Sequence, residues 1–218
     1  MDRWNWGRLV LEERVIAPDD ASVCGLRLSQ ELAKLWPGPF EDVHSLDEYH
    51  HRVKLLQNLE IEPLPPRFEG EMFDLMLQSL CSGKSSFQQL GTHLSPHVFH
   101  QLSHNEKAVL NRYCPTHITF RDRTIPVHYT SEGKPVIRLK IQDCFGLKSN
   151  PIIGEGRVPA TLHLLAPNGR IAQITDDLAG FWRGSYALVA KELKSRYPKH
   201  PWPSDPAHAS PPEPKKRR

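Results

Sequence analysis

The chain has 218 residues, of which 39% are hydrophobic and 24% charged, as is ordinary for a soluble protein. This length allows one large domain or two small ones with a buried core. No run of residues approaches the roughly 18 consecutive apolar residues of a membrane span, and the opening residues MDRWNW are not those of a signal peptide.

The net charge of +3 conceals an uneven distribution along the chain. Residues 1–115 carry 11 basic and 16 acidic side chains, whereas residues 116–218 carry 17 basic and 9 acidic ones, a net +8. Half of that excess lies in the last four residues, KKRR. The distribution indicates that the C-terminal half contacts a polyanion, although a solvated surface with a basic tail would give the same count.

The four cysteines, Cys24, Cys81, Cys114 and Cys144, are far apart in the sequence and form no C-x-x-C pair. Such spacing favours a reduced, cytoplasmic setting over a disulfide framework or a zinc site.

The first predicted element is a strand over residues 4–16, interrupted at Glu12-Glu13. A helix is expected to begin at about residue 18 and to continue to Leu35. It ends at WPGP, residues 36–39, because proline has no N–H donor and a fixed φ.

The region up to residue 113 reads as a series of helices. A helix is predicted over 45–60, where Ser45 and Glu48 have the spacing of a capping box. After a proline-rich linker, shorter helices are predicted at 68–81, 84–91 and 95–113. In the last of these, Ser95 is the expected N-cap and Pro96 the first helical residue.

The pattern changes at Pro115 from helical periodicity to alternation. Short strands are expected on both sides of turns at 122–123 and 131–135, followed by a strand at about 158–165. Asn168-Gly169 favours a tight hairpin because both residues tolerate positive φ, and a return strand follows over 170–174. These strands predict a small antiparallel sheet.

A long amphipathic helix is predicted from Thr175, its expected N-cap, to Arg196, where Pro198 enforces the stop. Its basic residues Arg183, Lys191 and Lys194 lie opposite an apolar face. That face comprises Leu178, Phe181, Trp182, Tyr186, Leu188, Val189 and Leu193.

We therefore predict an α+β fold, with a helical N-terminal part followed by a small antiparallel sheet, a long amphipathic helix and a proline-rich basic tail. The expected parts are a strand segment that ends an accessory domain (1–20), a helical region (21–113), a sheet-plus-helix domain (114–206) and a disordered basic tail (207–218).

Three features resemble catalytic or ligand-binding motifs but have simpler interpretations. Gly83-Lys84-Ser85 lacks the earlier glycine and the preceding strand of a P-loop. His97, His100 and His104 have helical spacing that could suit a metal, but apolar residues on the other side indicate a solvated face. Asp176-Asp177 is explained by helix capping. The residues support no catalytic site and imply no cofactor or metal.

The strongest functional signal is the set of basic residues after residue 120, since guanidinium and ammonium groups contact phosphates and exposed aromatic rings stack on bases. Two alternatives stay open for the aromatic members: Tyr197 reads mainly as a core residue, and Trp202 is either a packing or a stacking residue. The candidate nucleic-acid contacts are Arg121, Arg123, Arg138, Lys140, Arg183, Lys191, Lys194, Arg196, Lys199 and Trp202.

The C-terminal half resembles a known family. The segments GRVP (156–159), LHLLAP (162–167), TDDLAGFWRGSY (175–186) and RYPKHPWP (196–203) occur in this order in bacterial HrpB-type DEAH-box ATP-dependent RNA helicases. Upstream, CPTH (114–117), LKIQDCFG (139–146) and GRLVL (7–11) also match. The resemblance is specific over about 114–206 and weaker through the helical middle.

The resemblance implies a helicase C-terminal portion, in which two RecA-like motor domains precede this region. The motor motifs of that family, namely the P-loop, the DEAH box and the arginine finger, match no position in this sequence. We therefore expect no ATPase activity from this chain and carry over no catalytic residue.

Two functional hypotheses follow. The first is an accessory module that holds RNA or DNA non-specifically or docks on helicase motor domains in cis or in trans. The second is a protein-interaction module that does not bind nucleic acid, because a proline-rich segment loses little entropy when it docks in a groove.

Overall fold

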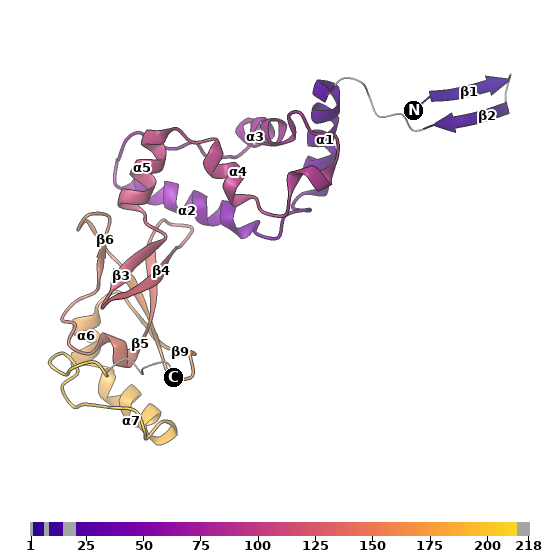
Figure 1. Cartoon of the computed structure of the whole chain (residues 1–218). Helices are drawn as coiled ribbons and strands as arrows, with labels where there is room; N and C mark the ends of the chain where they lie inside the picture. The colour runs from indigo at the N-terminus through magenta and orange to yellow at the C-terminus, as the bar shows by residue number, and fades with distance from the viewer. Residues whose placement is uncertain (1, 7–8, 15–20, 213–218) are drawn as a thin grey trace. The chain divides into compact units, whose positions relative to one another are not determined.

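The computed structural model describes residues 2–6, 9–14 and 21–212, with side chains from residue 23 onward (Figure 1). The chain divides into two compact units. Unit 1 comprises Met1–Asp47 and Pro66–Ser103, and unit 2 comprises Glu48–Pro65 and His104–Arg218. Helices dominate the first unit and a mainly antiparallel sheet the second, which confirms the predicted α+β class.

The N-terminal strand is a hairpin and not one interrupted strand. β1 (Asp2–Trp6) pairs antiparallel with β2 (Leu9–Arg14). The predicted break at Glu12-Glu13 is wrong, since both residues lie inside β2. In β2 both glutamates pair with β1, so this acidic pair does not end the strand.

Unit 1 is built around the packing of α1 (Ala21–Leu35) on α3 (Glu71–Cys81). The approach is close at Gly25, where an added Cβ would lie 2.7 Å from the Cys81 carbonyl oxygen. The 3₁₀ turn η1 (Phe87–Leu90) and the helix α4 (Ser95–His100) complete the unit. Its core includes Leu32, Met76, Leu77, Leu90, Leu94 and Val98.

The predicted helix over 95–113 is two helices, α4 and α5 (His104–Tyr113), separated by a turn at 101–103. The predicted Ser95 cap is also wrong. The backbone amides of Leu94 and Ser95 donate to the Asp42 carboxylate at 2.5 and 3.1 Å, so an acid 52 residues away in sequence caps α4.

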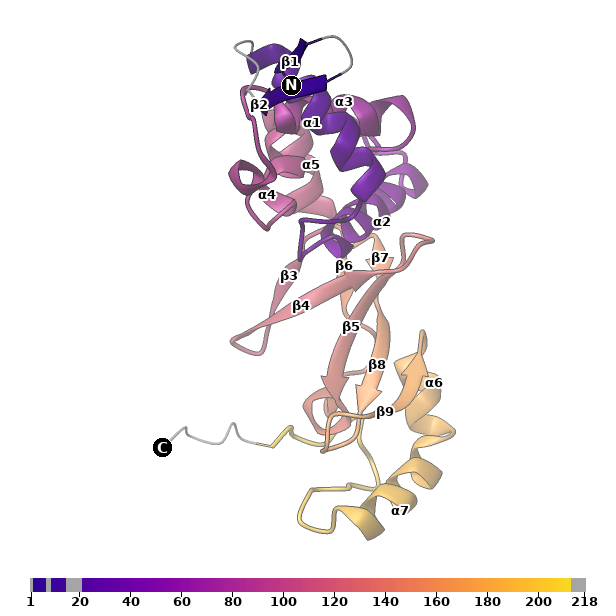
Figure 2. The same ribbon diagram turned by 90° about the vertical axis from the view of Figure 1, so that its right-hand side faces the viewer.

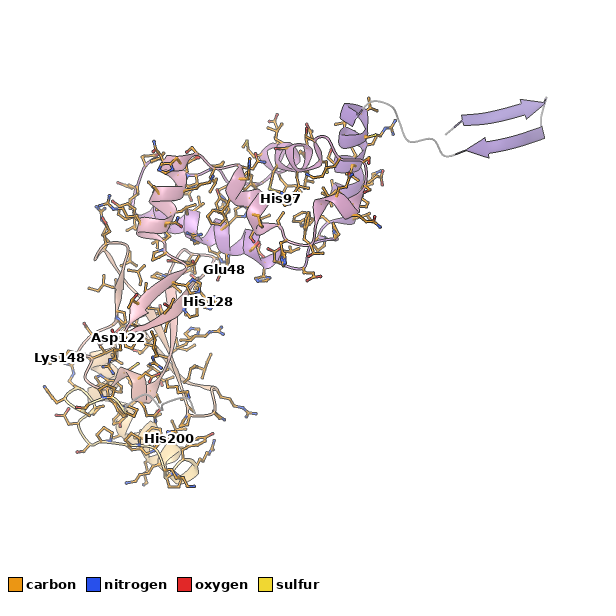
Figure 3. The ribbon with its side chains drawn as sticks, in the orientation of Figure 1. Glu48, His97, Asp122, His128, Lys148 and His200 are labelled. Atoms are coloured by element: carbon orange, nitrogen blue, oxygen red, sulfur yellow. The ribbon has the colours of Figure 1, made fainter. Side chains whose placement is uncertain are left out.

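The helix α2 (His44–Asn58) begins near its predicted start but without the predicted capping box. Ser45 Oγ has no hydrogen-bond partner among the described residues. The Glu48 carboxylate lies instead 2.8 Å from Nδ1 of His128 on the sheet of unit 2 (Figure 3). This contact takes the place of the capping-box bond to the helix's own amide.

Unit 2 contains a five-stranded sheet of order β3-β4-β5-β8-β9. The strands are β3 (His117–Phe120), β4 (Arg123–Tyr129), β5 (Pro135–Lys140), β8 (Thr161–Leu165) and β9 (Ile171–Thr175). All neighbours are antiparallel except β5 and β8, which are parallel and lie side by side in Figure 2.

The parallel pair departs from the predicted all-antiparallel sheet. Parallel strands need a long crossover, and here residues 141–160 provide it. They contain the 3₁₀ turn η2 (Ile141–Cys144) and a small hairpin of β6 (Ile152–Ile153) and β7 (Val158–Pro159).

Buried positions alternate with half-buried ones along β8 and with exposed ones from Ile137 onward in β5, whereas Pro135 and Val136 at the start of β5 are both buried. Ile137, Leu139, Leu162 and Leu164 are at most 3% exposed. Since successive side chains of a strand point to opposite faces, the sheet has one face in the core and one open face.

The predicted helix from Thr175 to Arg196 is interrupted. α6 comprises Leu178–Arg183, with Gly184 as its C-cap, and α7 (Tyr186–Arg196) starts two residues after that glycine. Glycine at 180 and 184 weakens a continuous helix. The cap is Asp177, whose Oδ1 accepts from Gly180 N at 2.9 Å, and not Thr175, which lies in β9.

The predicted apolar face is wrong at Leu188, which is 74% exposed on α7. The break after Arg183 resets the helical phase, so that Tyr186 and Leu193 still face the core whereas Leu188 does not.

An aromatic cluster and the C-terminal segment close the core of unit 2. Phe145, Phe181, Trp182 and Tyr186 lie with ring centroids 5.1–6.3 Å apart. The Tyr186 hydroxyl donates to the Pro203 carbonyl at 3.0 Å, and Gly146 N donates to the Pro206 carbonyl at 2.9 Å. Residues 197–206 are therefore bonded back onto the domain, and 213–218 of the predicted tail lie outside the described residues.

Candidate nucleic-acid interface

Arg121 and Arg123, at the turn between β3 and β4, are both engaged within the fold. Arg121 Nη2 donates to the Phe145 carbonyl at 2.5 Å, and its guanidinium lies 5.4 Å from the centre of the Phe120 ring. Arg123 Nη2 lies 3.2 Å from Asp143 Oδ2. These contacts hold the turn against η2 and the residue that follows it. Both arginines therefore stabilise the crossover over residues 141–160.

Arg138 and Lys140 are exposed on the open face of β5 and have no ion pair among the described residues. The register of the parallel pair places His163 of β8 beside Arg138. On the other side of β5, His128 of β4 is opposite Val136 and therefore on the same face. The open face thus carries a row of basic and titratable side chains across three strands.

His163 is the least solvated member of this row. Its Nδ1 is buried and has no hydrogen-bond partner among the described residues. Burial and the nearby Arg138 and His128 lower the pKa of His163. Burial is the larger cause and the neighbouring positive charge the smaller one, so the His163 imidazole is held neutral beside Arg138.

The second set of basic residues lies on and after the two helices. Arg183 on α6 and Lys191 and Lys194 on α7 are exposed, as predicted, and Lys199 is exposed beyond α7. Arg196 pairs with Glu192 at 3.0 Å, one helical turn away. The interruption at Gly184 places Arg183 on a different helix from the two lysines, so the three do not form the single stripe expected from the sequence.

Trp202 is half-buried and folded against the end of α7. Its Nε1 donates to the Tyr197 carbonyl at 3.1 Å. Tyr197 is itself half-buried and lies edge-on to His200, with ring centroids 6.2 Å apart. The indole therefore satisfies a helix-terminal carbonyl, which is the packing alternative of the two that the sequence left open.

The motif-like residues of unit 1 have structural partners. Lys84 donates to the Leu80 carbonyl, which directs it back to the end of α3. His97 Nε2 lies 3.2 Å from the Leu90 carbonyl, whereas His100 is exposed. Within the described ranges, no three His, Cys, Asp or Glu side chains come together as a metal site.

The four cysteines are all buried and free of disulfide bonds. Burial raises the pKa of Cys114 and of Cys144 to about 12, so both thiols stay protonated in the folded chain. None of them is placed to act as a nucleophile.

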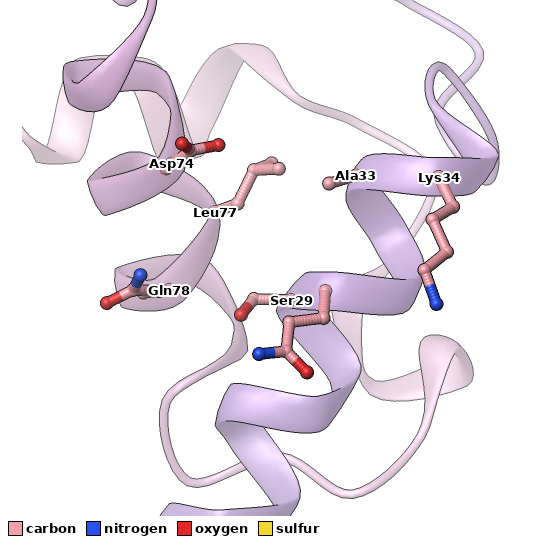
Figure 4. Close-up of a pocket in the computed structure, with 7 residues that line it drawn as sticks. Ser29, Ala33, Lys34, Asp74, Leu77 and Gln78 are labelled. Atoms are coloured by element: carbon pink, nitrogen blue, oxygen red, sulfur yellow. The ribbon is translucent and has the colours of Figure 1, made fainter.

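A pocket with a volume of about 390 Å³ lies between α1 and α3 of unit 1 (Figure 4). Ser29, Ala33 and Leu77 line it together with the polar side chains of Gln30, Lys34, Asp74 and Gln78. Lys34 lies 2.7 Å from Glu31, which partly neutralises it. One carboxylate and two amides provide no catalytic arrangement.

Sequence reasoning missed two histidines and one arginine. His128 and His163 alternate with apolar residues along their strands, a signal that could have identified them as members of the open face. Arg52 is 2% exposed and lies inside unit 2, where its Nε donates to the Cys114 carbonyl at 2.7 Å. No local pattern marks a buried arginine.

In the portion of the chain that the structure describes, none of the helices has the length and apolar character needed to cross a membrane.

Comparison with known proteins identifies relatives of this chain. Residues 76–206 match the family model described as ATP-dependent helicase C-terminal, HrpB_C. The ATP-dependent RNA helicase HrpB of Escherichia coli K12 is 45% identical over 103 residues, which cover 47% of this chain and 13% of that protein.

Two solved structures have the same fold. The crystal structure of the E. coli DExH-box NTPase HrpB matches with a TM-score of 0.75 and 27% identity over 96% of this chain and 27% of that chain. The crystal structure of the Escherichia coli DEAH/RHA helicase HrpB matches with a TM-score of 0.60 and 26% identity over 92% of this chain and 26% of that chain. This chain thus spans about a quarter of the solved relatives.

Proposed function

Because this chain belongs to the HrpB-type ATP-dependent helicase C-terminal family, we propose that it is an accessory module that holds RNA or DNA by the sugar-phosphate backbone. The family membership confirms the resemblance of the C-terminal half. Nucleic-acid contact is the further step, and it rests on the chain's own residues.

One observation carries this proposal, namely the two unpaired positive side chains of β5 on the open face of the sheet. Arg138 and Lys140 are exposed on one face of β5, without an ion-pair partner among the described residues, and His163 lies beside Arg138. A carboxylate near this row, Glu48, pairs with His128 and leaves the two β5 residues unpaired. Such groups bind phosphates regardless of base sequence.

The aromatic contribution to this binding is small. The Trp202 indole donates to the Tyr197 carbonyl at the end of α7. None of the open-face side chains described above is a Phe, Tyr or Trp. We therefore assign the contact to phosphates and not to base stacking, so that RNA and DNA single strands of any sequence bind similarly.

The test is a fluorescence-anisotropy titration of the 218-residue chain with a labelled single strand of about 20 nucleotides, at several salt concentrations. For single strands, each phosphate contact contributes about −0.7 to the slope of log K against log salt. The variant Arg138→Gln/Lys140→Gln should flatten the slope by about 1.4 and weaken binding at low salt.

The matched control is Lys148→Gln/Arg157→Gln, which removes the same charge from exposed positions elsewhere in unit 2. It should change the slope little. No binding at low salt, or equal losses in both variants, would refute the proposed interface.

The chain by itself is proposed to hydrolyse no ATP, since the motor motifs of the family match no position in it. A coupled ATPase assay with and without RNA should give the rate of the buffer blank in both cases. RNA-stimulated hydrolysis would contradict this assignment.

A second candidate function is docking to a helicase core through α7, and the exposure of Leu188 favours it. This side chain is 74% exposed and lies one turn from Lys191. Charge reversal at Arg183, Lys191 and Lys194 separates the two functions. Loss of nucleic-acid affinity would extend the phosphate interface to the helices, and unchanged affinity would leave α7 available for a protein partner.

A further inference from the structure

The strand β9 forms one edge of the five-stranded sheet, with β8 as its only sheet neighbour among the described residues. Its sequence, IAQIT, contains no lysine, proline or acidic residue, and its edge is interrupted by a bulge at Ala172. Ile171 and Ile174 are 50% and 51% exposed. An apolar edge of this kind is a template for pairing with another strand.

The charges at the two ends of β9 are opposite in sign. Arg170 precedes the strand and Asp176 follows it, and both are exposed, although Asp176 Oδ1 also accepts from the Thr161 hydroxyl of β8. Gln173 lies midway between them, so the segment from 170 to 176 is complementary to itself in the antiparallel direction. If one copy of β9 lies antiparallel to another with Gln173 opposite Gln173, Arg170 of each copy faces Asp176 of the other.

The register is centred on Gln173, next to the bulge. Gln173 Nε2 donates to its neighbour's carbonyl, Ile174 O, at 3.0 Å, a local bond that a second strand can replace. Two-fold symmetry makes every favourable contact occur twice.

From this edge we infer that the chain self-associates through β9, joining two five-stranded sheets into one antiparallel-paired sheet across a two-fold axis. The two-fold axis of an antiparallel pair is perpendicular to the sheet, so the open faces of both copies lie on the same side. The rows that contain Arg138 and Lys140 then form one continuous surface. The self-association itself does not depend on nucleic acid.

The test is the molar mass of the 218-residue chain, measured by analytical ultracentrifugation from about 1 μM to 1 mM because a single strand pair buries little surface. The mass should rise with concentration from 24.9 kDa toward twice that value. A monomer throughout this range overturns the proposal.

A charge swap tests the register. Arg170→Asp and Asp176→Arg each place like charges opposite each other twice per dimer and should weaken association at least tenfold. The double variant restores opposite charges and should restore most of the association. Lys148→Asp, at an exposed site away from β9, is the control and should leave association unchanged.

Two further measurements keep these outcomes interpretable. Thermal melting of each variant at low concentration establishes that the monomer is folded, and Ile174→Lys provides an independent change at the same edge. A dimer that survives Ile174→Lys and both single reversals uses another surface, which overturns the inference. A double variant that is folded but remains monomeric overturns the proposed register.

Discussion

Replacing Arg52 with alanine removes a charged side chain from the interior of unit 2. Arg52 is 2% exposed and lies on α2. Its Nε donates to the Cys114 carbonyl at 2.7 Å, and its Nη2 donates to the Leu110 carbonyl at 3.2 Å, both at the C-terminal end of α5. The guanidinium thus meets helix-terminal carbonyls, where the helix dipole favours positive charge.

The energetic cost can be estimated from these contacts. The Leu110 carbonyl still accepts from Cys114 N at 2.9 Å after the substitution, so only the Cys114 carbonyl loses its close charged donor. A buried acceptor left unpaired costs about 1–3 kcal/mol, and truncation of a large buried side chain to alanine costs about 2–5 kcal/mol.

Relief of the buried charge offsets part of this loss. Burial lowers the pKa of Arg52, which expresses the same desolvation cost. We expect a net destabilisation of about 3 kcal/mol for Arg52→Ala and of about 1–2 kcal/mol for Arg52→Met, because methionine fills most of the volume.

The assay is urea unfolding followed by tryptophan fluorescence and far-ultraviolet circular dichroism. Arg112→Ala is the matched control, since Arg112 is an exposed arginine of α5 paired with Glu155, and its midpoint should equal that of the unmodified chain. If Arg52→Ala unfolds at the same urea concentration as Arg112→Ala, the buried guanidinium does not stabilise the junction of α2 and α5.

Two further predictions concern pH and backbone geometry. Burial raises the pKa of Cys114 and of Cys144 to about 12 from the usual 9. Because the thiols ionise more readily in the unfolded chain, this stabilisation is complete below pH 9 and is lost as the pH rises from 9 toward 12, by about 1.4 kcal/mol per thiol and pH unit. Equal urea midpoints at pH 7 and pH 10 would argue against buried, protonated thiols. Gly133→Ala should lower the melting temperature more than Gly169→Ala. Both glycines have positive φ, 81° and 86°, but only at Gly133 would the new Cβ lie 2.6 Å from a backbone atom, Leu55 N. Equal losses in a thermal melt would mean that the close contact with α2 contributes nothing.

The local pattern of the sequence was sufficient for β5. Alternation predicted that Arg138 and Lys140 share one face, and the structure confirms it, with Ile137 and Leu139 buried on the other. The positions of most helices followed in the same way from apolar periodicity. These features depend on residues close together in the chain, which a sequence pattern can represent.

The errors arose where a distant residue decides the local structure. Asp42 caps α4 in place of Ser95. Glu48 contacts His128 and does not form the expected capping box. Arg52 binds carbonyls 58 and 62 residues away. In each case the local sequence offers a reasonable partner, and tertiary structure supplies a better one.

The concentration of positive charge in unit 2 is a consequence of topology and not of composition alone. Because β8 runs parallel to β5, the C-terminal ends of both strands lie at the same end of the sheet, where Lys140 pairs with Leu165. The turn that follows β8 places Arg170 at that same end of the sheet. With β8 antiparallel to β5, this arginine would lie at the opposite end, near Pro135. The long crossover over residues 141–160 therefore determines which basic residues lie at the same end of the sheet, and Arg121 and Arg123, bonded to η2 and its C-terminal end, stabilise that crossover.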